Sequence, residues 1–137
     1  DGSYSQQRGR NERCSLTEIG VLYWKYIPAF FRIGNDVNLD PCPVNKNYQL
    51  IRNILAIGVS EDGSVSDKNS HVLLLYDERN PAFVKGGNGF KSYAEVRAAL
   101  KRPNILRKCS WQKITHCMRK NNVLPWLTDQ LAAKYGL

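Results

Sequence analysis

The stretch His71-Val72-Leu73-Leu74-Leu75-Tyr76 is a continuous apolar run of strand length in a chain that is otherwise polar or helical in pattern. A strand that faces water on one side alternates apolar and polar residues, whereas a strand that is apolar on both faces is buried on both. The run therefore predicts an interior strand of a sheet covered on two sides. The rest of the chain offers few other strands to pair with it.

Helical spacing of apolar residues predicts the other elements. A capping-box pattern at Ser15 to Glu18 begins a helix that runs to Phe30, with Pro28 bending or ending its regular part. Further helices are expected over residues 45–59, 91–100, 110–120 and 125–135, and residues 60–70 form a polar loop with a glycine at its tip. We predict an α-rich α/β fold in which helices pack on a small sheet.

The length of 137 residues suits one domain with its own core. Residues 1–13 are polar and basic with almost no apolar side chain, so we expect a disordered or linker tail there. The prediction is then a single domain over residues 14–137, with a basic helical subregion over residues 91–137.

The helix predicted over residues 110–120 has a cap and two contrasting faces. Ser110 is the expected N-cap. The predicted apolar face holds Trp111, Ile114, Cys117 and Met118, and the opposite face holds Gln112, Lys113, His116, Arg119 and Lys120. In the next helix, Pro125 suits the first helical position, and Trp126, Leu127, Leu131 and Tyr135 form the apolar stripe.

The net charge of +8 is concentrated in one segment. Residues 91–120 hold nine Lys and Arg against one acid, and the rest of the sequence has eleven of each sign. A segregated surplus favours a polyanionic partner, here nucleic acid, over a merely solvated basic surface. The side chains predicted to contact phosphates are Lys101, Arg102, Arg107, Lys108, Lys113, Arg119 and Lys120.

The four cysteines are spaced too irregularly for paired zinc knuckles or a compact disulfide framework. Cys109 and Cys117 would lie about 12 Å apart along a helix, beyond disulfide reach. The N-terminus lacks the apolar core of a signal peptide, and no apolar run is long enough to cross a membrane. We expect a reduced, cytoplasmic protein.

Few residues suggest chemistry. The loop Lys85 to Gly89 is glycine-rich but lacks the Gly-Lys-Ser/Thr ending of a phosphate-binding loop, so it is interpreted as a mobile turn. Asp77 follows the predicted strand, a place where α/β folds often carry functional groups. The structural alternative is that Asp77 caps the strand exit through backbone hydrogen bonds while Arg79 neutralises a neighbouring charge.

Three segments together resemble the C-terminal half of restriction-endonuclease-like (PD-(D/E)XK) nucleases, in particular a bacterial branch. They are Cys42-Pro43 leading to Tyr48-Gln49-Leu50-Ile51-Arg52-Asn53, the apolar strand ending Tyr76-Asp77-Glu78-Arg79-Asn80-Pro81, and the tryptophan-bearing helix from Ser110. In that family the core runs helix, three strands, helix, strand. Residues 45–59 and 71–77 would be its last helix and strand, so the core would be incomplete in this chain.

The resemblance implies Mg²⁺-dependent hydrolysis of DNA phosphodiesters, double-stranded DNA as the partner, and homodimerisation. Gln49 matches a polar residue that supports the metal site, or is a helix-surface amide. Asp77 is a weaker catalytic candidate. Arg52 would reach a phosphate from the face of Gln49, or pair with Asp40 or Asp77. The family's Glu-X-Lys strand is missing, so the catalytic carboxylates are expected outside this chain, or catalysis has been lost.

A non-catalytic nucleic-acid-binding or protein-interaction module is the alternative. Its last two helices would form a pair like a helix-turn-helix. The connecting turn lacks the usual glycine, and the final helix offers only Lys134 as a base. The basic helix over residues 110–120 is therefore the better docking face.

Overall fold

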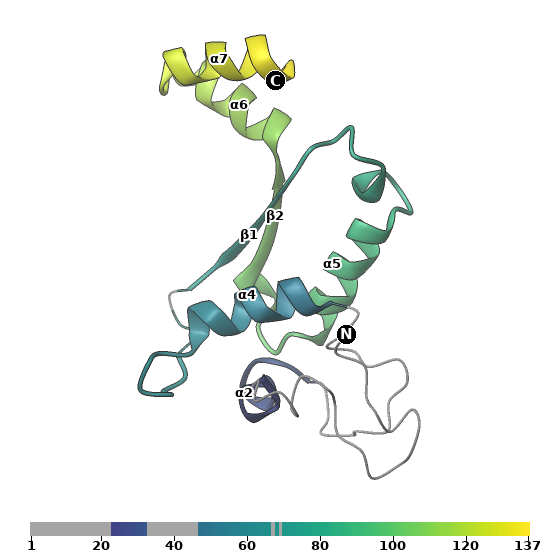
Figure 1. Cartoon of the computed structure of the whole chain (residues 1–137), viewed down its shortest axis with the longest axis vertical. Helices are drawn as coiled ribbons and strands as arrows, with labels where there is room; N and C mark the ends of the chain where they lie inside the picture. Colours follow the sequence, from purple (N-terminus) through teal and green to yellow (C-terminus); the bar gives the residue numbers. More distant parts are fainter. Residues whose placement is uncertain (1–22, 33–46, 67, 69) are drawn as a thin grey trace. The chain divides into compact units, whose positions relative to one another are not determined.

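The computed structural model describes residues 23–32, 47–66, 68 and 70–137, and within it the chain packs as two compact units (Figure 1). Unit 1 comprises the chain up to Val72 together with residues 92–106. Unit 2 comprises residues 73–91 and 107–137. The chain is helix-rich with a small sheet, which confirms the α-rich α/β prediction. The prediction of one domain over residues 14–137 stays a prediction.

Unit 1 contains helix α2 (Tyr23–Phe30), helix α4 (Tyr48–Gly58), most of helix α5 (Asn88–Ala99) and the short 3-10 helix η3 (Pro103–Ile105). The stripe predicted on α4 is confirmed, since Ile51, Ile54 and Leu55 are buried. Pro28 lies within α2, and the helix continues for two residues beyond it. The cap of α4 is Asn47, so the helix starts later than the predicted Asn45.

A single apolar cluster holds unit 1 together. Backbone hydrogen bonds from Arg32 N to Ala99 O (2.7 Å) and from Lys101 N to Phe30 O (2.8 Å) join the end of α2 to the end of α5. The fully buried apolar side chains all belong to this unit: Ile27, Phe30, Phe31, Ile51, Ile54, Leu55, Val96, Leu100, Ile105 and Leu106.

Gly58 of α4 packs directly against the ring of Phe30 in α2. A Cβ added there would lie 2.3 Å from Phe30 Cζ, and the Phe30 ring is only 2% exposed and cannot swing into solvent. We therefore expect Gly58→Ala to lower the free energy of unfolding by roughly 1–2 kcal/mol, as overpacking does. Urea denaturation would measure it. Asn53→Ala, at an exposed position of the same helix, should change stability by less than about 0.5 kcal/mol; equal effects of the two changes would contradict the expectation.

Unit 2 is built on a two-stranded parallel sheet, strand β1 (Val72–Tyr76) beside strand β2 (Leu106–Ser110) (Figure 1). The predicted strand is confirmed, but the prediction that it is buried on both faces is wrong. Leu73 is 51% exposed, and the other strand residues are half-buried. β2 was not predicted, because two adjacent basic residues, Arg107 and Lys108, hide its strand pattern.

Helix α6 follows β2 directly, and a short turn over residues 121–124 leads to helix α7. Ser110 ends the strand and caps helix α6 (Trp111–Lys120), its Oγ accepting a hydrogen bond from Lys113 N at 3.1 Å, as predicted. Pro125 begins helix α7 (Pro125–Tyr135) at the predicted position. The predicted apolar faces are partly wrong, since Trp111, Cys117, Trp126 and Tyr135 are exposed.

Polar side chains take the buried places in these two helices. Thr115 is buried on α6, where its Oγ1 donates to backbone oxygens of the preceding turn, and Thr128 is buried on α7. In unit 2, all of which the structure describes, the only fully buried side chains are Ser110, Thr115 and Thr128. The large apolar side chains of unit 2 therefore remain partly accessible to a ligand.

The glycine-rich loop leads directly into α5, which begins at Asn88 and not at the predicted Lys91 or Ser92. Gly87 and Gly89 pack against the 3-10 helix η2 (Pro81–Phe83): a Cβ at Gly87 would lie 2.5 Å from Ala82 O. Close backbone packing is a structural reason for glycine at both positions, and the interpretation of this loop as a mobile turn stays a prediction.

Several predictions concern residues outside the described ranges. These are the tail over residues 1–13, the start of the first helix at Ser15, and the Cys42-Pro43 part of the family resemblance. No helix in the described part of the chain combines the length and apolarity that a membrane crossing needs. Cys109 and Cys117 are free thiols, as predicted.

Candidate nucleic-acid interface

Unit 2 carries most of the excess positive charge. Its 50 residues hold nine Lys and Arg against three Asp and Glu, an excess of six, while the remaining sequence has eleven against nine. The basic segment over residues 91–120 is divided between the units, with six of its nine Lys and Arg in unit 2 and three in unit 1. An excess of this size on a small unit creates a positive potential that attracts a polyanion.

The outer face of α6 presents three side chains in one row. Lys113, His116 and Lys120 are exposed, and their spacing of three and seven residues places them on the same side of the helix. Ten of the described residues form this helix, and no acidic residue is among them. The row is a face on which a phosphate backbone would meet only positive or neutral groups.

Three other predicted phosphate contacts are already engaged within the protein. Arg119 Nη2 donates to Thr128 O at 3.2 Å and also to the backbone oxygen of Leu137, so this side chain joins α6 to α7. Lys101 Nζ donates to Pro28 O in unit 1. Lys108 Nζ lies 4.0 Å from the centre of the Phe90 ring, a cation–π contact.

The remaining predicted residues are exposed but divided between the units. Gln49 and Arg52 are exposed on α4 and Arg102 precedes η3, all in unit 1. Arg107 is exposed on β2 in unit 2. Asp77, the other catalytic candidate, belongs to unit 2, whereas Gln49 belongs to unit 1. Their catalytic and binding roles remain predictions.

Asp77 is the centre of a hydrogen-bond network at the end of β1. Its Oδ1 accepts from Arg79 N (2.8 Å), Arg79 Nε (2.9 Å) and Gln112 Nε2 (2.8 Å), and its Oδ2 accepts from Arg79 Nη2 (2.6 Å). The next acid, Glu78, accepts from Ser110 Oγ at 2.6 Å and donates its N–H to Gln112 Oε1 at 3.1 Å. The expected structural role of Asp77 and Arg79 is confirmed, and the network joins the end of β1 to the start of α6.

These contacts hold the pKa of Asp77 well below its usual range, first through the Arg79 side chain, then through the Arg79 backbone N–H and Gln112. The same ion pair raises the pKa of Arg79. A lowered carboxyl pKa means that the unfolded chain takes up a proton first as the pH falls, near the ordinary value of about 3.9. Asp77 therefore stabilises the fold at neutral pH, and this contribution is lost progressively below about pH 4.

Asp77→Asn should consequently flatten the acid limb of the stability curve. We expect the urea midpoint of the native chain to fall more steeply than that of the variant between about pH 4 and pH 2. Arg79→Gln, which removes the main partner, should flatten the curve in the same way, and the double variant should add little to either change. A variant curve as steep as the native one would contradict the assignment.

The described acids do not fit a magnesium site. Nowhere in the described ranges do three His, Cys, Asp or Glu side chains come together. Asp77 Oδ1 is fully occupied by hydrogen-bond donors, and Glu78 is committed to Ser110. Magnesium prefers several oxygen ligands in octahedral geometry, and a single arginine-paired carboxylate cannot supply them.

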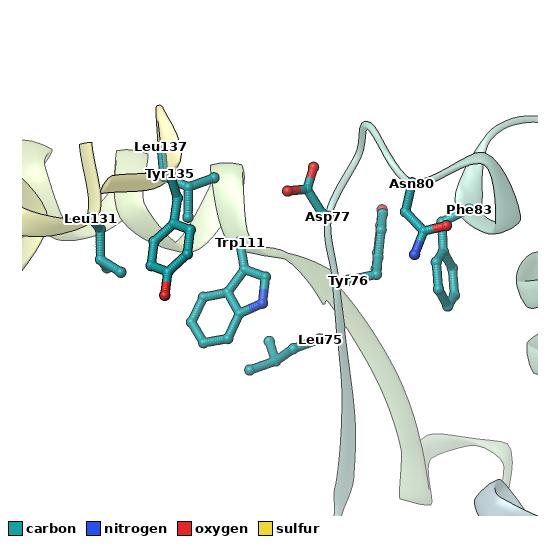
Figure 2. Close-up of a pocket in the computed structure, with 9 residues that line it drawn as sticks. All are labelled: Leu75, Tyr76, Asp77, Asn80, Phe83, Trp111, Leu131, Tyr135 and Leu137. Carbon is teal, nitrogen blue, oxygen red and sulfur yellow. The ribbon is translucent and has the colours of Figure 1, made fainter. Parts of the chain in front are cut away.

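A pocket of about 470 Å³ opens beside this network, entirely within unit 2 (Figure 2). Four aromatic side chains line it, one each from β1, η2, α6 and α7, and the carboxylate of Asp77 lies at its edge. The full lining is Leu75, Tyr76, Asp77, Asn80, Phe83, Trp111, Leu131, Tyr135 and Leu137. Sequence reasoning assigned Trp111 and Tyr135 to helix packing; their exposed fractions of 40% and 50% show that the rings remain accessible.

Comparison with known proteins gives one match. The family model described as "Restriction Endonuclease associating with ARP" matches residues 2–136, nearly the whole chain. No curated protein and no solved structure matches significantly. The match covers both units, so the sequence resemblance to restriction endonucleases is confirmed over the length of the chain.

Proposed function

This chain belongs to the family of restriction endonucleases associating with ARP, and from that premise we propose that it binds double-stranded DNA as the DNA-binding part of a restriction-type nuclease. Family membership supports a role related to restriction-type nucleases. The contact with DNA, and the phosphates as its target, are the proposal.

The observation that supports it best is the exposed row Lys113, His116 and Lys120 on α6, in a unit with an excess of six positive charges. Two flexible lysines on one helix face, with a histidine between them, suit phosphates, because such contacts position a protein along the backbone without reading bases. Arg119, Lys101 and Lys108 are expected to support the fold more than the contact, since each already has a partner in the protein.

Catalysis is a separate part of the proposal. If the family's Mg²⁺-dependent hydrolysis operates here, its carboxylates have to come from outside the described residues, since those residues do not fit the ion. The chain's own contribution is then to hold the duplex. We expect the described acids, Asp77 and Glu78 included, to serve structure and recognition.

Titration of the purified chain into a labelled duplex of random sequence, without Mg²⁺, tests the proposal. Fluorescence anisotropy at several salt concentrations gives the slope of log K against log salt. We expect a slope of about −3 or steeper, which corresponds to at least three neutralised phosphates. An absence of binding at low salt, or a slope near zero, would overturn the proposal.

A protein-interaction module is the second candidate, and one observation favours it. Val123, Leu124 and Trp126, at and after the turn between α6 and α7, are 47%, 48% and 59% exposed. Exposed apolar side chains in a cluster often mark a protein interface. Absence of DNA binding in the titration, together with a complex resistant to high salt with a protein partner, would favour this candidate.

A further inference from the structure

We infer that the pocket of unit 2 receives one unstacked nucleobase of the bound DNA, with Trp111 and Tyr135 as the stacking surfaces and Asp77 as a hydrogen-bond acceptor. The inference rests on the proposed function, because it supposes that DNA reaches unit 2. It adds a site that a purely phosphate-binding surface would not have.

The first argument for a bound base is the aromatic lining of the pocket. Trp111 from α6 and Tyr135 from α7 lie on the same side of β1, and both line the pocket (Figure 2). Each ring is exposed to a degree that is unusual for large aromatic side chains with a packing role only. Bases stack on such surfaces in single-strand and base-flipping proteins, and stacking tolerates any base because each has a π face. The volume of about 470 Å³ lies in the range of small-molecule sites.

The polar groups carry the second step. Asp77 Oδ1 accepts three hydrogen bonds, but Oδ2 accepts only one among the described residues, from Arg79 Nη2. A carboxylate oxygen has two lone-pair sites, so Oδ2 can accept one more bond. The ring N–H and exocyclic amine groups of bases are the matching donors. Asn80 Oδ1 is occupied by Ala82 N, which leaves its amide N–H groups as donors at the same pocket.

The charges around the pocket distinguish a base from a cationic ligand. An aromatic cage with an acid also suits a methylated ammonium group. Here the acid is already neutralised by Arg79, and unit 2 has an excess of six positive charges, which disfavours a cation. A Cβ at Gly136 would lie 3.6 Å from Arg79 Nη1, so this guanidinium borders the chain between two lining residues, Tyr135 and Leu137. A nucleotide would find a stacking surface for its base and, in Arg79 Nη1, a hydrogen-bond donor for its phosphate.

The experiment compares two duplexes that differ by one unpaired base. The first is fully paired, and the second carries one extra adenine in the middle, which has no pairing partner. Anisotropy gives both affinities in the same buffer. We expect the native chain to bind the bulged duplex about 5-fold or more tightly, because it offers a base at little unstacking cost. Trp111→Ala should reduce this preference to about 1 and leave the affinity for the paired duplex nearly unchanged.

Two further variants serve as controls for the assignment of the bulge preference to the pocket. Trp126→Ala removes a tryptophan that is 59% exposed on α7 but does not line the pocket, so the preference should persist. Trp111→Phe keeps a stacking ring and should retain much of the preference, even if Trp111→Ala fails to fold.

Each contrary outcome has a separate meaning. Equal binding of the two duplexes by the native chain would overturn the pocket and leave the proposed function standing. Binding of neither duplex would overturn both. Trp111-dependent binding of a trimethyllysine peptide, with no preference for the bulge, would reassign the pocket to a cationic ligand.

Discussion

Replacing Lys113 and Lys120 together by alanine is expected to weaken duplex DNA binding about 10-fold or more at low salt, and to reduce the salt slope by about 2. Both side chains are exposed on one face of α6, seven residues apart, so they would meet the same strand of a duplex. Each neutralised phosphate contributes about 0.9 to the slope through counterion release. The two parameters should therefore change together.

Sequence dependence should be absent from this effect. Phosphate contacts carry no base information, so the double variant should lose affinity about equally for duplexes of different sequence. The change in the salt slope distinguishes direct contact of the lysines with phosphates from long-range electrostatic attraction. A drop in affinity with an unchanged slope would mean that the lysines act from a distance, and the proposed docking face would then be wrong.

A matched control removes the same charge elsewhere. Lys25 and Lys68 are exposed in unit 1, and their double replacement by alanine also lowers the net charge by two. If binding depends only on net charge, the two double variants should be equivalent. We expect the control to retain the native slope and to lose less than about 2-fold in affinity.

The sequence predicted elements best where a local signal fixes a helix end or a whole face. Ser110 and Pro125 stand where the predicted cap and first turn require them. The α4 stripe was recognisable because its apolar side chains repeat at helical spacing against a real core. Such signals depend only on neighbouring residues, so they survive without knowledge of the tertiary structure.

The errors have a common physical cause, which is that burial is set by partners distant in sequence. An apolar run such as Leu73 to Leu75 implies two covered faces only if the chain supplies two covering layers, and Leu73 is half exposed in the two-stranded sheet. Similarly, apolar spacing assigned Trp111 to a packed face, while the smaller Thr115 takes the buried place. Periodicity locates a face, but it does not tell which side chains a neighbour covers.

The same limit applies to the candidate site: the sequence predicted part of it, and contacts between distant residues decide the rest. The charge count located the basic segment in the sequence, and six of its nine Lys and Arg lie in unit 2. Counting could not separate side chains that face solvent, such as Lys113, from those that bind backbone oxygens, such as Lys101 and Arg119. The pocket could not be predicted from the sequence either, because its lining comes from β1, η2, α6 and α7. A tyrosine and a tryptophan at opposite ends of two helices give no sequence signal of a shared cavity.

Variants of Arg119 can test whether a basic side chain is available to DNA or instead holds the fold together. Its guanidinium donates to Thr128 O and to the backbone oxygen of Leu137, and so fastens the last helix to α6. Hydrogen bonds from a charged group are each worth about 1.5–3 kcal/mol. Since the side chain is partly exposed, we expect Arg119→Ala to lower the free energy of unfolding by about 2 kcal/mol and to increase hydrogen exchange in α7.

Arg119→Lys is the decisive companion variant. It keeps the positive charge, but a single ammonium group lacks the planar fork that reaches two separated oxygens. If Arg119 is a phosphate contact, as its place in the basic segment suggested, lysine should preserve DNA binding and stability. If it fastens α7, lysine should reproduce most of the stability loss and the faster exchange, whereas Lys113→Ala on the same helix should do neither.

We expect Arg119→Lys to show the loss of stability and the faster exchange, because Arg119 fastens α7. This has a consequence for the pocket. Leu131, Tyr135 and Leu137 form the α7 side of the lining, so loosening α7 should disturb the cavity even though Arg119 does not line it. Arg119→Lys should therefore reduce the preference for the bulged duplex while the salt slope for the paired duplex stays native. Native stability of Arg119→Ala, with a salt slope lowered by about 1 that Arg119→Lys restores, would instead return Arg119 to the phosphate-binding face.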